Sequence, residues 1–245
     1  MTTRATPSLE AQQKFWNDHW HRWEQRKVIN NWSLARAEKI LELLRSLSVQ
    51  DANILDLGCG IGWFTERLTD FGHVTGIDLS EDAIAAAKAR CSKVTFVAGN
   101  ILETVLPTGR FDVIVSQEVL AHVEDQSRYM WSAAELLKPG GYLILTTANR
   151  FVLEHLGTVT MNAFPPEHIE LFVSARQLKR LLRPHFRILG VKSSFPLGNG
   201  GILRMINSYK LNAVLGSIIP QPYLESLKEW AGLGYSLLAL AQKPN

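Results

Sequence analysis

Short apolar segments alternate with longer segments of helical periodicity through the middle of the chain. Five of them have the length and composition of buried strands: residues 54–57, 73–78, 94–98, 111–116 and 142–147. Between them, Ser80 and Asp125 are placed to cap helices over residues 81–90 and 126–137. Such alternation predicts a parallel sheet with helices on both faces, an α/β doubly wound fold over residues 52–148.

Helical periodicity also predicts two helices before the sheet. Residues 9–27 bring Phe15, Trp16, Trp20 and Trp23 onto one face, which either packs on the domain or acts as a lid. Residues 33–47 carry an apolar stripe, with Ser33 as the expected N-cap. We expect residues 1–8 to be disordered and residues 1–50 to form an N-terminal helical cap on a domain of residues 51–245.

The C-terminal third adds two strands and an insert. A helix at 174–182 precedes strands at 186–193 and 234–241, which gives seven strands in total. Between the last two strands lies a helical insert, about residues 196–232, with short helical patterns at 201–215 and 222–230. An insert of this length usually serves a site. Its apolar residues are expected either to cover a modest organic molecule or to be ordinary core: Leu203, Met205, Ile206, Tyr209, Ile218 and Ile219.

Composition and charge exclude several classes of protein. The chain has 245 residues, of which 46% are hydrophobic and 20% charged, as in a soluble globular domain. We interpret its net charge of +3 as a mild excess spread along the sequence, which gives little support for nucleic acid as a partner. Two cysteines support neither a disulfide framework nor a metal site. No signal peptide or membrane-spanning run is evident, so we expect a cytoplasmic protein, monomeric or homodimeric.

A glycine-rich turn follows the first strand of the sheet. Gly58, Gly60 and Gly62 alternate after Asp56, and a helix is predicted to open at Trp63. Glycine lets a ligand approach the bare backbone, and a helix N-terminus favours an anionic group. The spacing is D-x-G-x-G-x-G and not the dinucleotide pattern G-x-G-x-x-G, which disfavours a nicotinamide dehydrogenase.

The second strand ends in a carboxylate. Asp78 stands 20 positions after Gly58, where nucleotide-binding sheets place an acid that accepts hydrogen bonds from both ribose hydroxyls. The alternative is an acid at a helix N-terminus. Asn100, after the third strand, is either a ligand contact or a turn residue.

The order and spacing of these motifs resemble the class I S-adenosylmethionine-dependent methyltransferases, in particular small-molecule types such as the O-methyltransferases of ubiquinone biosynthesis. The resemblance covers about residues 52–195 and rests on LDLGCGIG, GIDLS, GN-I, FDVIVSQEVLAHV, LKPGGYLILTTANR and EHIELF. It implies a Rossmann-like, mostly parallel seven-stranded sheet and S-adenosylmethionine as the cofactor.

The same resemblance implies the cofactor contacts. Asp56, Gly58, Cys59, Gly60, Gly62 and Gln117 would lie near the methionine part, with the loop approaching its carboxylate through backbone N–H groups. Asn100 would contact the adenine amino group, and Ile101 and Leu79 would flank the ring.

The chemistry left to the protein is alignment of the acceptor and removal of its proton, because the cofactor carries an activated methyl group. A hydroxyl or acidic carbon needs a base, and histidine is the obvious one. His122, just past the fourth strand, and His168, after the fifth, are the candidates, with Glu118 to orient a base or the acceptor. His122 could instead position its own loop, and the reaction could proceed by proximity alone. His19 and His21 are expected at the surface.

We therefore predict a methyltransferase that acts on a small organic acceptor, at oxygen first. The alternatives are carbon or nitrogen as the acceptor atom, or a fold that binds the cofactor without turnover. Ser116-Gln117-Glu118-Val119 lacks the Asn/Asp-Pro-Pro-Tyr/Phe motif of amide and adenine N-methyltransferases. We expect no metal, no nucleic-acid partner and no integral membrane segment.

Overall fold

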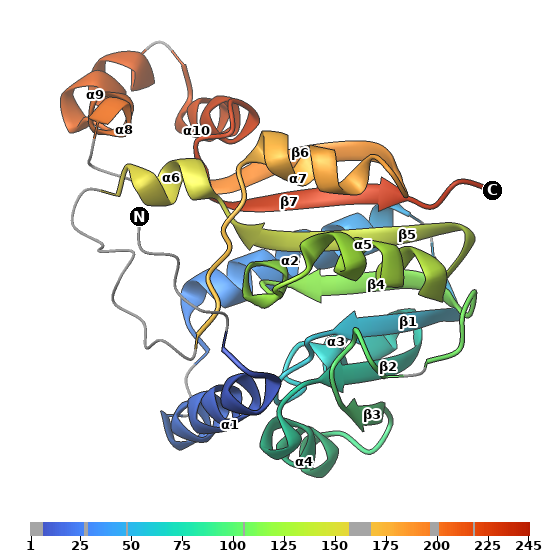
Figure 1. Cartoon of the computed structure of the whole chain (residues 1–245). Coiled ribbons are helices and arrows are strands. Elements are labelled where there is room, and N and C mark those ends of the chain that lie inside the picture. The colour runs from blue at the N-terminus through green and yellow to red at the C-terminus, as the bar shows by residue number, and fades with distance from the viewer. Residues whose placement is uncertain are drawn as a thin grey trace.

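The computed structural model describes residues 7–26, 29–47, 49–104, 106–156, 168–196, 201–217 and 219–245. A seven-stranded sheet forms its centre, with helices on both faces (Figure 1). The order of the strands is β3-β2-β1-β4-β5-β7-β6. Their bounds are β1 (Ala52–Leu57), β2 (Gly72–Asp78), β3 (Thr95–Ala98), β4 (Phe111–Gln117), β5 (Leu137–Ala148), β6 (Arg187–Pro196) and β7 (Gly234–Gln242).

Strands β1 to β5 are parallel, and β7 runs antiparallel between β5 and β6. The chain winds outward from β1 toward β3 and then, from β4, in the opposite direction. This reversal makes a switch point between β1 and β4, where sheets of this kind bind ligands outside the carboxyl ends of the strands. The predicted fold class, doubly wound and mostly parallel with seven strands, is confirmed.

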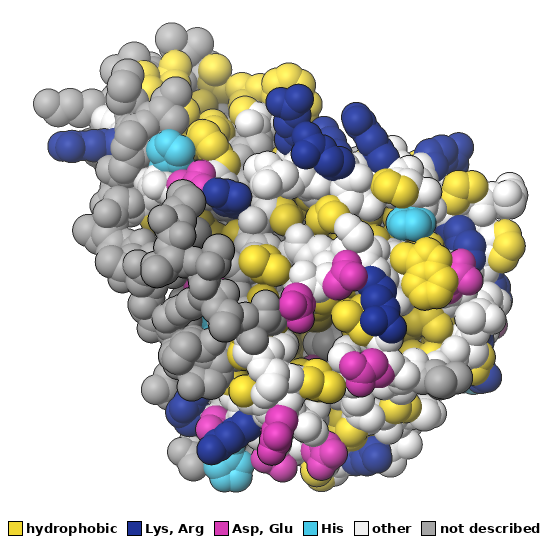
Figure 2. Space-filling view, in the orientation of Figure 1, with side chains coloured by type: hydrophobic (Ala, Val, Ile, Leu, Met, Phe, Trp, Pro, Cys, Tyr) yellow, Lys and Arg dark blue, Asp and Glu magenta, His cyan; other side chains and the backbone are white. Residues whose placement is uncertain are grey.

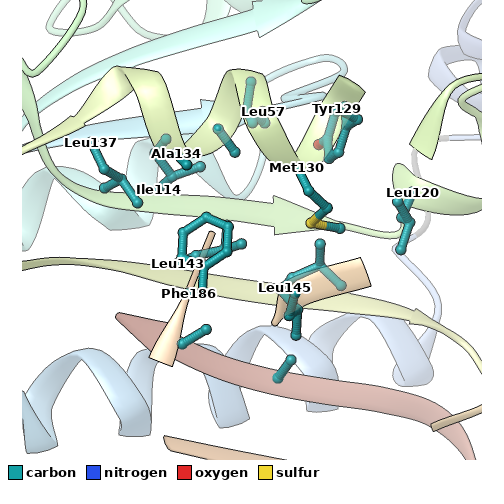
Figure 3. Packing of buried hydrophobic residues seen from close by; sticks show 14 of the residues in the cluster. Leu57, Ile114, Leu120, Tyr129, Met130, Ala134, Leu137, Leu143, Leu145 and Phe186 are labelled. Atoms are coloured by element: carbon teal, nitrogen blue, oxygen red, sulfur yellow. The ribbon is translucent and has the colours of Figure 1, made fainter. Parts of the chain in front are cut away.

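Alternate residues of the strands face two separate cores. On one face, helices α5 (Gln126–Leu136) and α7 (Ala175–Leu182) cover the sheet; Figure 3 shows Met130 of α5 beside Leu145 of β5. On the other face lie α2 (Asn31–Ser46) and α4 (Glu81–Arg90). Burial on both faces explains the nearly continuous apolar strands of the sequence.

Two of the three helix caps were predicted correctly. The side chains of Ser80 and Asp125 accept hydrogen bonds from the backbone N–H groups of Ala83 and Arg128, at 3.0 and 2.9 Å, and so cap α4 and α5. The expected Ser33 cap is wrong. Asn30 caps α2 instead, because its Oδ1 accepts from the N–H group of Ser33 at 2.8 Å. Asparagine is as good an N-cap as serine, and two further residues therefore join the helix.

Three other expectations on local structure need correction. The helix predicted to open at Trp63 is a single turn, α3 (Thr65–Leu68), followed by the 3₁₀ turn η1 (Thr69–Phe71). The fifth strand, predicted over residues 142–147, begins earlier, so that residues 139–141 lie within β5 (Leu137–Ala148), where Gly140 has φ 75° beside an irregularity in the pairing with β4. Helix α6 (Arg150–Glu154) was not predicted.

The N-terminal helix and the insert complete the fold. Helix α1 (Leu9–Arg26) ends within one residue of its predicted bound. The insert holds three helices where two patterns were expected: α8 (Gly201–Ile206), α9 (Tyr209–Gly216) and α10 (Gln221–Trp230). Residues 1–6, Ile218 and the side chains of Met205 and Tyr209 lie outside the described part of the structure. None of the described helices combines the length and apolarity needed to cross a bilayer.

Candidate functional site

The carboxyl ends of β1, β2 and β4 open into a cavity of about 1040 Å³ at the switch point of the sheet. All three predicted catalytic residues and eight of the ten predicted cofactor residues line it: Asp56, Gly58, Cys59, Asp78, Leu79, Asn100, Ile101, Gln117, Glu118, His122 and His168. Gly60 and Gly62 are not among the lining residues. The structure thus brings residues far apart in the sequence to one place, and their roles there remain predictions.

The glycine loop is held by its own backbone hydrogen bonds. The N–H groups of Gly58 and Cys59 both donate to the carbonyl of Ile77 in β2, at 2.8 and 3.0 Å. Gly60 donates to Asp78, and Gly62 donates to the carbonyl of Cys59. The expectation that these N–H groups point at a ligand carboxylate is therefore wrong for all four residues. They fix the loop to the neighbouring strand instead.

Two glycines of the loop are required by close packing. Gly58 and Gly60 have φ values of 76° and 52°, in the left-handed region that disfavours side chains. A Cβ at Gly58 would overlap the side chain of Val119, and one at Gly60 would overlap the ring of Trp20 from α1. Glycine is needed at both positions because the side chains of Val119 and Trp20 pack directly against the backbone of the loop.

Asp56 is buried, at 2% exposure, and holds the loop from inside. The hydroxyl of Thr65, at the start of α3, donates to its carboxyl oxygen at 2.6 Å. Burial raises the pKa of Asp56 to about 7, and nearby Asp78 adds to the rise while the hydrogen bond from Thr65 opposes it. Asp56 therefore stabilises the turn between β1 and α3.

Asp78 receives two backbone hydrogen bonds. Gly60 donates to Oδ2 at 2.8 Å and Ser80 to Oδ1 at 2.9 Å. Burial raises its pKa, and these hydrogen bonds act in the opposite direction. Because an ionised carboxylate has about four acceptor positions, both oxygens can still accept a hydroxyl of a ligand.

Asn100 is a turn residue in this structure. Its Oδ1 accepts from the N–H group of Leu102 at 3.0 Å, and its carbonyl accepts from Glu103 and Thr104. The turn role that the sequence left open is thus present. An adenine contact through the same residue stays a prediction.

Two polar side chains at the end of β4 differ in their hydrogen bonding. The Nε2 atom of Gln117 is buried and has no hydrogen-bond partner among the described residues. A buried donor without an acceptor is costly, so this position fits a polar ligand atom. Glu118, with φ 60°, is held by Arg36 of α2 at 3.3 Å and by the hydroxyl of Ser236 at 2.9 Å.

His122 lies at the end of the 3₁₀ turn η2 (Leu120–His122), and its Nδ1 is 2.9 Å from the carbonyl oxygen of Ile169. A carbonyl can only accept, so Nδ1 carries the proton and Nε2 keeps a basic lone pair. Burial lowers the pKa of His122, with the hydrogen bond to Ile169 and the charge of Glu118 opposing this. The imidazole is therefore neutral at neutral pH.

His168 stacks on His122, with ring centroids 4.6 Å apart. Burial and the neighbouring His122 and His19 lower the pKa of His168 to about 4. His19 was expected at the surface, and that expectation is wrong: the side chain is half-buried and lines the cavity. Burial lowers its pKa as well. Three neutral imidazoles thus line the cavity, with the rings of His122 and His168 in contact.

Helix α1 forms a wall of the cavity through its aromatic face. Phe15 stacks on His168 at 4.5 Å between centroids, and Trp16 packs edge-on against His122 at 5.0 Å. The Oδ1 atom of Asn17 accepts a hydrogen bond from Ser80 at 2.7 Å, which ties α1 to the start of α4. The aromatic stripe therefore faces the site, and Arg36 and His19 are lining residues that sequence reasoning missed. Within the described ranges, no group of three or more His, Cys, Asp or Glu side chains is arranged to hold a metal ion.

Comparison with known proteins gives consistent matches. Residues 21–185 match a family model described as a methyltransferase domain. The mitochondrial ubiquinone biosynthesis O-methyltransferase of Schizosaccharomyces pombe is 34% identical over 149 residues, which cover 53% of each chain. The ubiquinone biosynthesis O-methyltransferase of Coxiella burnetii is 34% identical over 120 residues, 47% of this chain and 51% of that one. The match thus spans about half the length of these relatives.

Solved structures share the fold. The N-methyltransferase NodS of Bradyrhizobium japonicum, in complex with S-adenosyl-L-homocysteine, aligns over 94% of this chain and 99% of its own, with a TM-score of 0.62 and 21% identity. A methyltransferase from Mesorhizobium loti, described as S-adenosylmethionine dependent, aligns over 82% of this chain and 96% of its own, with a TM-score of 0.59 and 22% identity.

Proposed function

Because this chain belongs to the S-adenosylmethionine-dependent methyltransferases of class I, we propose that it transfers a methyl group from S-adenosylmethionine to an oxygen atom of a small organic acceptor. One observation carries this proposal. A single cavity connects the glycine loop and Asp78 with His122 and His168. Its volume of about 1040 Å³ is enough for a nucleoside cofactor and a modest second molecule.

The residues at the first end of the cavity fit the cofactor. Asp78 would accept the ribose hydroxyls, Leu79 and Ile101 would flank the adenine, and the orphaned Nε2 of Gln117 would donate to a polar atom. When bound, S-adenosylmethionine supplies a methyl group already activated on a sulfonium. The chain has only to bind it and exclude water around it.

The residues at the second end fit an acceptor with a proton to lose. The lone pair of His122 Nε2 would accept the proton of an acceptor hydroxyl, since Nδ1 is committed to Ile169. His168 and Trp16 would keep the ring of His122 in place. Glu118, itself held by Arg36 and Ser236, would orient the acceptor.

We also propose that α1 caps this cavity, that residues 51–245 with the insert form the methyltransferase domain, and that the protein works in the cytoplasm as a monomer or homodimer. Its partner would be the small acceptor, without nucleic acid. The aromatic contacts of α1 with His122 and His168 support the cap.

The test is incubation with S-adenosylmethionine carrying a ¹³C-labelled methyl group and a panel of phenols, alcohols, amines and acidic carbon compounds. Mass spectrometry and NMR then identify the labelled atom. We expect label on oxygen, and loss of it in a variant with both His122→Gln and His168→Gln. Label on nitrogen or carbon would overturn the oxygen assignment. Binding of S-adenosylhomocysteine with no label transferred to any class of acceptor would favour a non-catalytic protein.

A further inference from the structure

The positive charge of this chain is concentrated in one stretch of sequence. Residues 171–224 contain eight of the 26 Lys and Arg residues and none of the 23 Asp and Glu residues. The remainder of the chain has 18 cations against 23 acids. The expectation of an evenly spread excess is therefore wrong, because a basic segment is masked by an acidic remainder.

The fold gathers much of this charge on α7. Arg176, Lys179 and Arg180 of α7 and Arg183 at its C-cap are all exposed, while Leu178 and Leu182 of the same helix are buried. None of the ion pairs found within the described ranges includes any of the four cations. Figure 2 shows dark-blue side chains collected over the region of α7.

Helix α10 exposes an apolar face. Tyr223, Leu227 and Trp230 are 68%, 52% and 81% exposed, and their spacing of four and three residues puts them on one side of the helix. Leu224 and Lys228 face inward. Scattered exposed apolar residues are ordinary, but three large ones on one helix face indicate a contact surface. The two acids of α10, Glu225 and Glu229, are paired with Lys228 and Lys39.

Both helices pack against β6, which is an edge strand of the sheet. In Figure 1 both helices lie along the β6 end of the sheet, α7 on the face that α5 covers and α10 toward α2, whose Lys39 pairs with Glu229. We name this surface the docking edge: Arg176, Lys179, Arg180, Arg183, Tyr223, Leu227 and Trp230.

A simpler explanation accounts for only part of this surface. Charged side chains on an edge strand prevent pairing with other chains, and the exposed Arg187 and Lys192 of β6 fit that purpose. Arg176, Lys179, Arg180 and Arg183 lie on α7 and its C-cap and protect no strand edge. The apolar face of α10 would increase association and not prevent it.

We propose that the docking edge binds the surface of an anionic lipid membrane. Tyr223, Leu227 and Trp230 enter the boundary between headgroups and acyl chains, where tryptophan and tyrosine are favoured, and the cations of α7 contact the lipid phosphates. Charge complementarity selects anionic lipid. Tyr223 and Trp230 could also stack on the bases of a nucleic acid, so the test below includes single-stranded RNA. This binding is independent of the proposed methyl transfer.

The test uses the full chain without cofactor and vesicles of two compositions, pure phosphatidylcholine and a 7:3 mixture of phosphatidylcholine and phosphatidylglycerol. We expect flotation with the mixed vesicles and not with the neutral ones, and release at high salt. The variant K179E/R180E/R183E and, separately, Trp230→Ser should each weaken binding, the first by at least about tenfold. Vesicles with brominated lipid should quench tryptophan fluorescence less in Trp230→Ser than in the native chain.

Matched controls lie at other places on the surface. K88E/R90E/K93E makes the same change of charge at exposed positions beside β3, the opposite edge of the sheet, and Trp131→Ser removes another exposed tryptophan. Both should bind vesicles like the native chain. Absence of vesicle binding at low salt, or equal losses in control and docking-edge variants, would overturn the proposal. So would binding of single-stranded RNA that depends on the docking edge when vesicles are not bound.

Discussion

At the scale of single residues, burial decides the chemistry that the site can perform. His19, His122 and His168 all have lowered pKa values, and all three lose the charged form mainly through burial. Neighbouring imidazoles further lower the pKa of His168 and, together with Arg22, that of His19, because a charge on one group disfavours a like charge on the next. An imidazole that stays neutral is available as a base over a wider range of pH than a free histidine.

This environment makes a pH-dependent prediction for the two candidate bases. Protonation would disable either base, and a lowered pKa moves that loss to a pH below the ordinary value of 6.5. We expect kcat to be retained near pH 6, where a free histidine would be mostly charged. His122→Gln should lower kcat by roughly 10²–10⁴-fold and leave the affinity for S-adenosylhomocysteine unchanged. Steady-state kinetics between about pH 5 and 8 and calorimetry measure the two quantities.

His73→Gln is the matched control, because His73 is exposed and is not among the residues that line the cavity. It should leave kcat and its pH dependence unchanged. Near-normal rates in both His122→Gln and His168→Gln would show that alignment of the acceptor is sufficient for the reaction.

Other residues show what the sequence could and could not predict at this scale. Asp78 and His122 follow strands, and parallel strands bring their carboxyl ends together, so their common location was predictable. Arg36 and His19 come from helices before the sheet, and nothing in their local pattern shows which way a helix docks. Asn100 has the same amide whether it closes a turn or contacts a ligand, and the turn is revealed by the hydrogen bonds that Asn100 accepts from Leu102, Glu103 and Thr104.

At the scale of the elements, the glycine loop depends on its neighbours more than on the helix that follows. Helix α3 has four residues, because the chain must return to β2 at Gly72. A Cβ at Gly72 would overlap the backbone of Ala52, so the two strands meet there at close range. A helix of one turn has little dipole to offer a ligand. The contacts of Asp56, Asp78 and Trp20 order the loop instead.

Helix α1 is expected to act as a lid because it touches both ends of the cavity. Trp20 lies on Gly60, and Phe15 and Trp16 pack on the histidines. Trp20→Ala removes apolar contacts with the loop that holds the cofactor. We expect S-adenosylhomocysteine to dissociate about tenfold faster, which corresponds to about 1.4 kcal/mol of lost contact. Stopped-flow fluorescence or surface plasmon resonance measures this rate.

Trp131→Ala provides the control for this measurement, because Trp131 is exposed on α5 and does not line the cavity. Its dissociation rate should match that of the native chain. An unchanged rate in Trp20→Ala would mean that α1 is only a packed helix, the other interpretation that its aromatic stripe allows.

At the scale of the whole molecule, the sheet could be predicted more completely than the helical insert and the charged surface. Its strands are buried on both faces, which gives long apolar runs in the sequence. Parallel neighbouring strands need a long crossover connection, which is usually a helix. The insert was predicted with two helical patterns and has three helices, since short helices on a surface have few buried positions to set a period. The concentration of charge in residues 171–224 is visible in the sequence, yet only the fold shows that α7, which carries much of it, and the apolar face of α10 both lie along β6.

Binding of the cofactor product should stabilise the whole chain, because the cavity is built from β1, β2, β4 and α1 together. A ligand at about 100 times its dissociation constant adds about 2.7 kcal/mol to the free energy of unfolding. For a protein of this size that is a rise in Tm of roughly 5–10 °C, measured by differential scanning calorimetry with S-adenosylhomocysteine. Asp78→Asn should lose most of the rise, since one oxygen that accepts ribose hydroxyls becomes a donor.

Asp82→Asn is the appropriate comparison, because Asp82 is exposed in the first turn of α4, close to Asp78 in sequence but outside the cavity lining. It should keep the full rise in Tm. NADH at the same excess should give none, because the glycine spacing does not follow the dinucleotide pattern. A rise with NADH and none with S-adenosylhomocysteine would contradict the cofactor assignment itself. A rise shared by Asp78→Asn would contradict only the role of that carboxylate.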